Sequence, residues 1–190
     1  MAPAGPTLDQ LKARLKLLPA AALAQRVYRS STPDYASDAD LLSGEGSRRF
    51  GGRWNPIGIG VVYGSLTPEI AMAEALAHNR YYAIPIEEAM PRTFVAIETK
   101  LKAVIDFRVG SVRQRIQVSL GRILAVDWRK EVQSGRTPIT QLIGQAACEI
   151  GLEGLIVPSA AYPDGHNLLV FPANLQPGSA IRVLNPDRLI

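Results

Sequence analysis

One short segment of the chain brings together residue types that bind anions. Gly51 and Gly52 precede Arg53, and Trp54 and Asn55 follow it. Adjacent glycines permit backbone conformations that other residues avoid, and they let a ligand approach the main chain closely. Arginine binds phosphate through two parallel N–H bonds. The segment is therefore predicted to form an anion-binding loop, with Arg53 as the cation and the two glycines supplying backbone donors.

One carboxylate stands alone in an apolar stretch. Glu74 lies within residues 70–77, whose other members are isoleucine, alanine, methionine and leucine. Thr67 and Pro68 precede the stretch and are typical of a helix start. A helix that is apolar on every face is typically buried, and an unpaired carboxylate there costs several kcal/mol. Glu74 therefore either has a function or reaches solvent or a structural arginine.

The order and spacing of these residues resemble those of the RES domain, a family named for an Arg, a Glu and a Ser. Tyr63 follows ten residues after Arg53, and Glu74 follows eleven residues after Tyr63. Ser159, at the end of an apolar run, matches the serine of the family. The resemblance begins near residue 27 and extends almost to the C-terminus, so several separate motifs carry it.

The resemblance implies a fold, a reaction and a partner, because RES domains are the toxin half of bacterial toxin–antitoxin pairs. The fold would be like that of ADP-ribosyltransferases, with a strongly bent sheet around a cleft for NAD. The reaction would break the nicotinamide–ribose bond by hydrolysis or phosphorolysis, with NAD as substrate and no metal. An Xre-type helix-turn-helix antitoxin would block the active site, and a homodimer of the toxin would form within a larger complex.

Two other functions fit the same residues. An ADP-ribosyltransferase would pass ADP-ribose from the same NAD site to a target protein, and no residue here identifies the acceptor. A non-enzymatic interaction domain would use Arg53 and Glu74 merely as partners of each other. Release of nicotinamide from NAD distinguishes an enzyme from an interaction domain.

An NAD-cleaving site needs few parts, and the chain offers a candidate for each. The diphosphate needs a cation, the nicotinamide needs a flat apolar surface, and the ribose needs a carboxylate beside its developing positive charge. Tyr63 or Trp54 would stack on the nicotinamide, and Glu74 would face the ribose. Arg53 would bind the diphosphate, or equally hold the ribose and the carboxylate in place. Ser159 would hydrogen-bond Glu74, the ribose or the nicotinamide amide. Without such a role, Trp54 would be a core residue and Asn55, before Pro56, a turn residue. The expected catalytic residues are Arg53, Tyr63, Glu74 and Ser159, and the expected NAD-binding residues are Arg29, Gly51, Gly52, Trp54, Asn55 and Asn167.

Hydrophobic periodicity and turn residues predict the elements that position these side chains. Helices are expected at 8–18, from 68 onward, at 111–120 and at 140–150, and strands at 25–30, 60–63, 93–99, 103–107, 154–157, 167–171 and 181–184. Residues 31–48 are predicted to be a long loop that forms a wall of the site.

Helices and strands that do not alternate regularly favour a single compact α+β domain with a bent mixed or antiparallel sheet. We expect an N-terminal tail and amphipathic helix at 1–20 and a RES domain at 22–190. The helix would dock on its own domain, or else on another chain.

Composition narrows the class of protein further. The chain has 190 residues, enough for one domain, and no apolar run long enough to span a membrane. The net charge is +4, but the basic residues are dispersed, so direct DNA binding is not expected. Two histidines are too few for a zinc site. The single Cys148 and the lack of a recognisable secretion signal predict a cytoplasmic protein.

Overall fold

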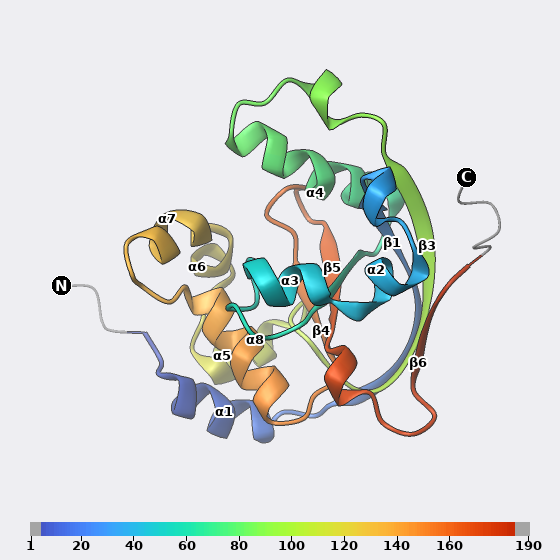
Figure 1. Ribbon diagram of the computed structural model, residues 1–190. Helices are drawn as coiled ribbons and strands as arrows, with labels where there is room; N and C mark the ends of the chain where they lie inside the picture. The colour runs from blue at the N-terminus through green and yellow to red at the C-terminus, as the bar shows by residue number, and fades with distance from the viewer. Residues whose placement is uncertain (1–4, 185–190) are drawn as a thin grey trace.

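Six strands form one mixed sheet in the structure, which is a computed structural model that describes residues 5–184 (Figure 1). The strands are β1 (Ala21–Ser31), β2 (Val62–Ser65), β3 (Thr93–Asp106), β4 (Gly154–Pro158), β5 (His166–Val170) and β6 (Ala180–Val183). The order β1-β2-β5-β4-β3 returns to β1 because β3 also pairs with β1, so the sheet closes into a small barrel to which β6 is added. The β3–β4 pair is parallel and the other pairs are antiparallel. The predicted α+β fold with a bent mixed sheet is confirmed, and its closure goes beyond the prediction.

Helices lie outside the barrel. They are α1 (Leu8–Lys16), α2 (Asp38–Ser43), α3 (Glu45–Phe50), α4 (Pro68–Tyr81), α5 (Gly110–Ile116), α6 (Leu120–Leu124), α7 (Trp128–Gln133) and α8 (Ile139–Glu149), with short 3₁₀ turns η1 (Pro33–Tyr35), η2 (Ile86–Ala89) and η3 (Pro172–Asn174). Gly151, the predicted end of the helix at 140–150, follows α8 with φ of 85°. The segments 93–99 and 103–107, predicted as two strands, are one strand because Lys100, Leu101 and Lys102 continue its exposed–buried alternation.

Side chains on opposite faces of the sheet pack into two separate cores. Leu169 of β5 belongs to the core that α1, α5 and α8 share, whereas its neighbour Leu168 belongs to the other. Val61 and Tyr63 face the first core and Val62 the second, as the alternation of side chains along a strand predicts. Strand β2 thereby delivers Tyr63 to the same side as the helices.

Helix α1 docks on its own domain. Thr7 and Gln10 form a capping box, and Leu11 and Leu15 are buried against α8. The alternative that this apolar face serves another chain is wrong, because the leucines are already buried. Two terminal stretches lie outside the described residues. They are residues 1–4 of the predicted N-terminal segment (1–20) and residues 185–190 of the predicted RES domain (22–190).

Helix α4, which carries Glu74, is half-buried rather than buried on every side. It begins at Pro68 as predicted, and Thr67 Oγ1 accepts a hydrogen bond of 3.4 Å from the Ile70 N–H. Ile70 and Ala71 are buried, and residues 72–77 are partly exposed. The prediction of an all-round buried helix is wrong because α4 packs on β1 and β2 with one side only and lines a cavity with its small side chains.

The segment 31–48, predicted as a loop, contains η1, α2 and most of α3. Ser37 caps α2 by accepting a hydrogen bond of 3.2 Å from the Asp40 N–H, and Gly44, with φ of 69°, joins α2 to α3. The Ser, Asp and Gly residues that indicated a loop are helix caps here. None of these residues lines the cavity described below, so the predicted site wall is also wrong.

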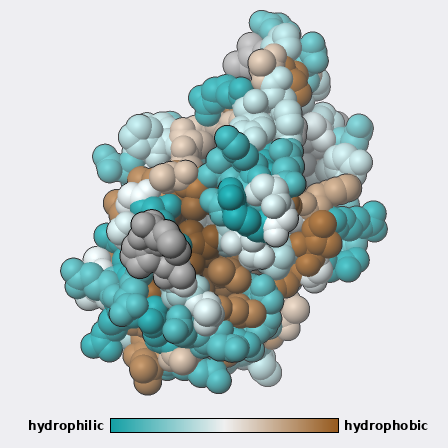
Figure 2. All heavy atoms as spheres, turned by 90° about the vertical axis from the view of Figure 1, so that its left-hand side faces the viewer, coloured by the Kyte–Doolittle hydropathy of each residue, from teal (hydrophilic) through white to brown (hydrophobic). Residues whose placement is uncertain are grey.

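The outer surface is mixed in polarity. Figure 2 shows the face that carries α6 and α7, on which hydrophilic side chains surround separate apolar patches. Helix α4 and η2 project at the top of the molecule in both views (Figures 1 and 2). Within residues 5–184, no helix has the length and apolar character needed to cross a bilayer.

Candidate active site

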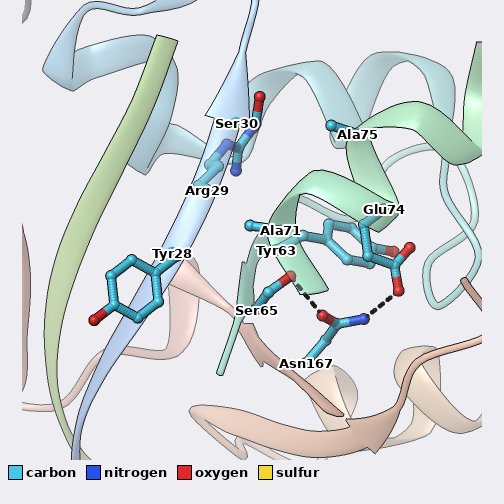
Figure 3. Close-up of a pocket in the computed structure, with 9 residues that line it drawn as sticks. All are labelled: Tyr28, Arg29, Ser30, Tyr63, Ser65, Ala71, Glu74, Ala75 and Asn167. Atoms are coloured by element: carbon cyan, nitrogen blue, oxygen red, sulfur yellow. Dashed lines mark hydrogen bonds between the residues drawn. The ribbon is translucent and has the colours of Figure 1, made fainter. Parts of the chain in front are cut away.

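A cavity of about 250 Å³ lies between β1, β2, β5 and α4 (Figure 3). Among the described residues, β1 pairs with β2 at Tyr28↔Ser65 alone, which leaves the edge of β1 beyond that point free to line the cavity. Arg29 and Glu74 lie apart within it in Figure 3. The lining residues are Tyr28, Arg29, Ser30, Tyr63, Ser65, Ala71, Glu74, Ala75 and Asn167.

Glu74 is held by two side chains from another part of the chain. Its Oε1 accepts hydrogen bonds from Ser159 Oγ at 2.7 Å and from Asn167 Nδ2 at 2.6 Å. Asn167 Oδ1 in turn accepts one of 2.8 Å from Ser65 Oγ, which fixes the orientation of the amide. In the described part of the chain no hydrogen bond ends on Oε2, so this oxygen is available to a ligand.

Ser159 is bound both to Glu74 and to two backbone N–H groups. Its Oγ accepts hydrogen bonds from the N–H groups of Ala161 (3.1 Å) and Tyr162 (3.0 Å) and gives its own proton to Glu74. The side chain is 5% exposed. Of the partners that the sequence left open for Ser159, the structure brings it to Glu74.

Arg29 places an uncompensated cation in the cavity. Its Nη1 is buried, and it has no hydrogen-bond partner among the described residues. Burial lowers the pKa of Arg29, and the nearby Tyr63 opposes that shift. A buried guanidinium without a carboxylate is costly by itself, so this arrangement suits an anionic ligand.

Tyr63 lines the cavity with its ring, because its hydroxyl is already bound. The hydroxyl accepts a hydrogen bond of 3.0 Å from the Trp54 N–H and donates one of 2.7 Å to Asn55 Oδ1. Burial raises the pKa of Tyr63 well above its ordinary value, so the phenol stays protonated near neutral pH. The ring is therefore what Tyr63 offers to a ligand.

The two glycines shape a turn and do not supply free donors. Gly51 has φ of 69°, and its N–H binds the carbonyl of Ser47 at 2.8 Å. The Gly52 N–H binds the carbonyl of Asn55 at 2.9 Å, and a Cβ on Gly52 would meet the Tyr63 hydroxyl at 2.6 Å. Both N–H groups are thus bound within the protein, and the contact of these glycines with NAD stays a prediction.

Trp54 and Asn55 lie in the core, and their contacts with NAD stay a prediction. Trp54 is 2% exposed and packs edge-on against Phe107, which leaves its ring no face for the nicotinamide. Asn55 is fully buried, and its amide donates to the carbonyls of Ser47 (2.8 Å) and Ile59 (2.8 Å). Asn55 therefore stabilises the turn by linking its two ends through hydrogen bonds.

The Arg53 side chain extends from the turn to the end of α6. Its Nη1 donates to the carbonyl of Val126 at 2.9 Å, and its Nη2 donates to those of Ile123 at 2.7 Å and Leu124 at 3.2 Å. Burial lowers the pKa of Arg53, and the charge of Glu74 raises it, so the two groups act on each other. Backbone carbonyls at the end of α6 thus bind both Nη atoms, while the buried Nε has no partner among the described residues, and a contact of Arg53 with NAD stays a prediction.

Two contributions to the site escaped the sequence analysis. Ser65 orients Asn167 across the β2–β5 pair, a contact that depends on strand register. Ala71 and Ala75 lie four residues apart on one face of α4, and their small side chains leave room for the cavity. Two alanines at this spacing were the available signal for the second contribution.

The whole arrangement identifies the class of protein. Residues 26–189 match the family described as "RES domain". The chain belongs to the RES domain family, which confirms the resemblance seen in its motifs.

Individual relatives are named for their activities. The chain is 31% identical over 147 residues to the "Prs ADP-ribosylating toxin" of Sphingobium sp. (strain YBL2), a match that covers 77% of this chain and 82% of that protein. It is 30% identical over 124 residues to the "NAD(+) phosphorylase MbcT" of Mycobacterium tuberculosis (strain ATCC 25618 / H37Rv), covering 64% of this chain and 62% of that protein.

A solved structure shares the fold. The crystal structure of the M. tuberculosis MbcT–MbcA toxin–antitoxin complex contains a chain that aligns with a TM-score of 0.71 and 25% identity, over 95% of both chains. This chain therefore shares its fold, over nearly its whole length, with a chain of a toxin–antitoxin complex.

Proposed function

We propose that this chain is the toxin of a toxin–antitoxin pair and that it depletes cellular NAD by cleaving the nicotinamide–ribose bond. One observation carries the proposal: Glu74 is clamped by Ser159 and Asn167 in the cavity that also holds the unpartnered Nη1 of Arg29. Such a cavity offers NAD a carboxylate for its ribose and a cation for its diphosphate. The names of the relatives support NAD as the substrate.

The proposed step needs a carboxylate and no proton donor. Nicotinamide leaves C1′ with the bonding electron pair and becomes a neutral pyridine, so nothing has to protonate it. Positive charge develops on the ribose, and Glu74 Oε2 stabilises it, because the two hydrogen bonds on Oε1 fix the carboxylate in place. Arg29 anchors the diphosphate, and the Tyr63 ring gives the nicotinamide an apolar surface.

The acceptor of ADP-ribose distinguishes two candidate reactions. Transfer to phosphate or water destroys NAD, whereas transfer to a protein modifies a target. Each has support in a relative, since one is named an NAD(+) phosphorylase and another an ADP-ribosylating toxin. NAD destruction is our first candidate, and modification of a target protein, through an ADP-ribosyltransferase-like fold, is the second.

A cytoplasmic antitoxin of the Xre helix-turn-helix type would neutralise the toxin. The RES family and the antitoxin-bound relative support this partner. An acidic segment over Arg29 would occupy the place of the diphosphate. Other arginines near the turn already have partners, because Arg48 and Arg49 pair with Glu45 at 2.6 Å and the Nη atoms of Arg53 bind backbone carbonyls. A toxin homodimer in that complex stays a prediction.

Purified protein incubated with NAD should release nicotinamide. Water, phosphate and candidate proteins are supplied as acceptors in turn, and the ADP-ribose product is identified by mass. Folded protein that releases no nicotinamide with any acceptor contradicts the proposal and leaves the interaction domain as the function.

Expression in a bacterial host tests the toxin role separately. The chain alone should arrest growth and lower cellular NAD, and co-expression of its genomic neighbour should reverse both. Soluble protein that leaves cellular NAD unchanged contradicts NAD depletion.

A further inference from the structure

A cation is held by aromatic rings between α4 and α7. The Arg129 guanidinium carbon lies 4.4 Å from the ring centroid of Trp128, 4.8 Å from that of Tyr81 and 5.8 Å from that of Tyr82. Tyr81 also donates a hydrogen bond of 3.4 Å to Asp127, next to α7. The rings thus fix the guanidinium where the end of α4 meets α7.

The rings position Arg129 without neutralising it. Within residues 5–184, no carboxylate lies within 4.0 Å of its guanidinium, and no side-chain hydrogen bond uses it. By contrast, Arg108 pairs with Asp106 and Arg182 with Glu98, both at 2.6 Å. A cation–π contact fixes a guanidinium and leaves its N–H donors free for an anion.

The cluster lies on the Glu74 side of α4, beyond the cavity. Tyr81 follows Glu74 by seven residues, which puts both on one helix face about 10 Å apart along the axis. The cavity-lining Ala71 and Ala75 are on the other flank, toward β1. Glu74 and Arg129 both influence the pKa of the intervening Arg53, after burial as the main cause.

Among the described residues, the lining of the cavity holds one cation, Arg29, which the proposed function assigns to the diphosphate of NAD. A phosphate acceptor therefore needs another cation, and Arg129 supplies one on the flank away from Arg29, without a carboxylate partner in that part of the chain.

We propose that Arg129, held by Trp128 and Tyr81, binds inorganic phosphate as the acceptor and thereby directs the enzyme to phosphorolysis. This inference rests on the proposed cleavage of NAD and deepens it. A phosphate oxygen forms a bond to C1′ while the C1′–N bond breaks, and nicotinamide leaves with that electron pair. Hydrogen phosphate carries the charge needed for attack, so no further reactant is required.

Nicotinamide release from NAD over a range of phosphate concentrations tests this role. With wild-type protein, the rate of nicotinamide release should rise with phosphate concentration, and the product should be a phosphorylated ADP-ribose. Arg129→Gln should raise the apparent KM for phosphate at least about tenfold, because it removes charged hydrogen bonds. Its phosphate-free hydrolysis should remain near the wild-type rate, which also reports that the variant is folded.

Matched variants separate charge from position. Lys130→Gln removes the same charge one residue further on, at an exposed site, and should leave the phosphate response unchanged. Arg129→Lys should retain part of it. An unaltered phosphate response in Arg129→Gln overturns the proposal.

The behaviour of wild-type protein separates the two hypotheses. If the rate of nicotinamide release does not depend on phosphate concentration, the role of Arg129 is overturned, but the proposed cleavage of NAD is not contradicted. A wild-type protein that releases no nicotinamide contradicts the proposed function itself.

Discussion

The turn at 51–55 and the cavity around Glu74 are both rich in polar groups, but they differ in how those groups are used. In the turn, the N–H groups of Gly51 and Gly52, the Asn55 amide and both Arg53 Nη atoms bind partners within the protein, and only the buried Arg53 Nε among these groups has no partner in the described residues. In the cavity, Arg29 Nη1 has no such partner either. Most polar groups of the turn are thus already bound within the protein, whereas the cavity keeps a guanidinium nitrogen available to a ligand.

The difference shows that the role of a polar residue depends on which of its hydrogen-bond donors are already bound within the protein. A buried donor that is bound contributes to stability, whereas one left unbound costs free energy unless a ligand binds it. Substitutions in the turn should therefore affect the free energy of unfolding, and those in the cavity should affect activity. The following predictions test that division.

The largest effect is expected at Glu74. Glu74→Gln keeps both hydrogen bonds to Oε1 but removes the negative charge, so kcat should fall about 10²–10³-fold while NAD still binds. Kinetics of nicotinamide release and calorimetric titration with NAD measure the two quantities. Glu69→Gln, in the exposed first turn of the same helix, is the control and should retain activity. Near-normal turnover in folded Glu74→Gln would sink the assigned role.

Asn55→Ala should affect stability and spare the chemistry. It removes the donor to the carbonyls of Ser47 and Ile59 and the acceptor of the Tyr63 hydroxyl proton, which should cost about 2–4 kcal/mol of unfolding free energy. Urea denaturation measures this loss. At a temperature where the variant is folded, kcat should stay within a few-fold of wild type. A stable but inactive Asn55→Ala variant would move the turn into the catalytic machinery.

Arg29→Met should behave in the opposite way. Replacing an unpartnered buried cation with an apolar side chain should leave stability unchanged or raise it. The KM for NAD should rise about 10–100-fold, because charged hydrogen bonds to the diphosphate are lost. Arg26→Met, exposed on the same strand, is the matched control. A destabilised Arg29→Met with normal KM would make Arg29 a structural residue.

The smallest effect is expected at Arg49. Its guanidinium pairs with Glu45 at 2.6 Å on the surface of α3 and is two-thirds exposed, so it has little to offer an anion in the cavity. Arg49→Gln should change the KM for NAD less than about twofold. A change comparable to that of Arg29→Met would place α3 at the mouth of the NAD site.

Much of the fold could be predicted because its causes are local. Alternation along the strands, the capping box of Thr7 and Gln10, and Pro68 at the start of α4 all follow from neighbouring residues. The boundaries failed where local signals have two meanings: the Ser and Gly residues of 31–48 cap short helices instead of forming a loop. The alternating side chains of β3 continue across a segment that the prediction split into two strands.

The sequence by itself determined the family, the α+β class and the isolation of Glu74 on its helix, since motif order and periodicity are properties of the chain. Only the tertiary structure decided which polar groups are hydrogen-bonded within the protein. Arg53 meets carbonyls at 123–126, Gly52 meets Gln141, and Glu74 meets Ser159 and Asn167. These partners lie 70 to 93 residues away along the chain, and closure of the barrel brings them together. A hydrogen bond acts only at contact distance, so no spacing within the motif could tell a donor bound by the protein from one left for a ligand.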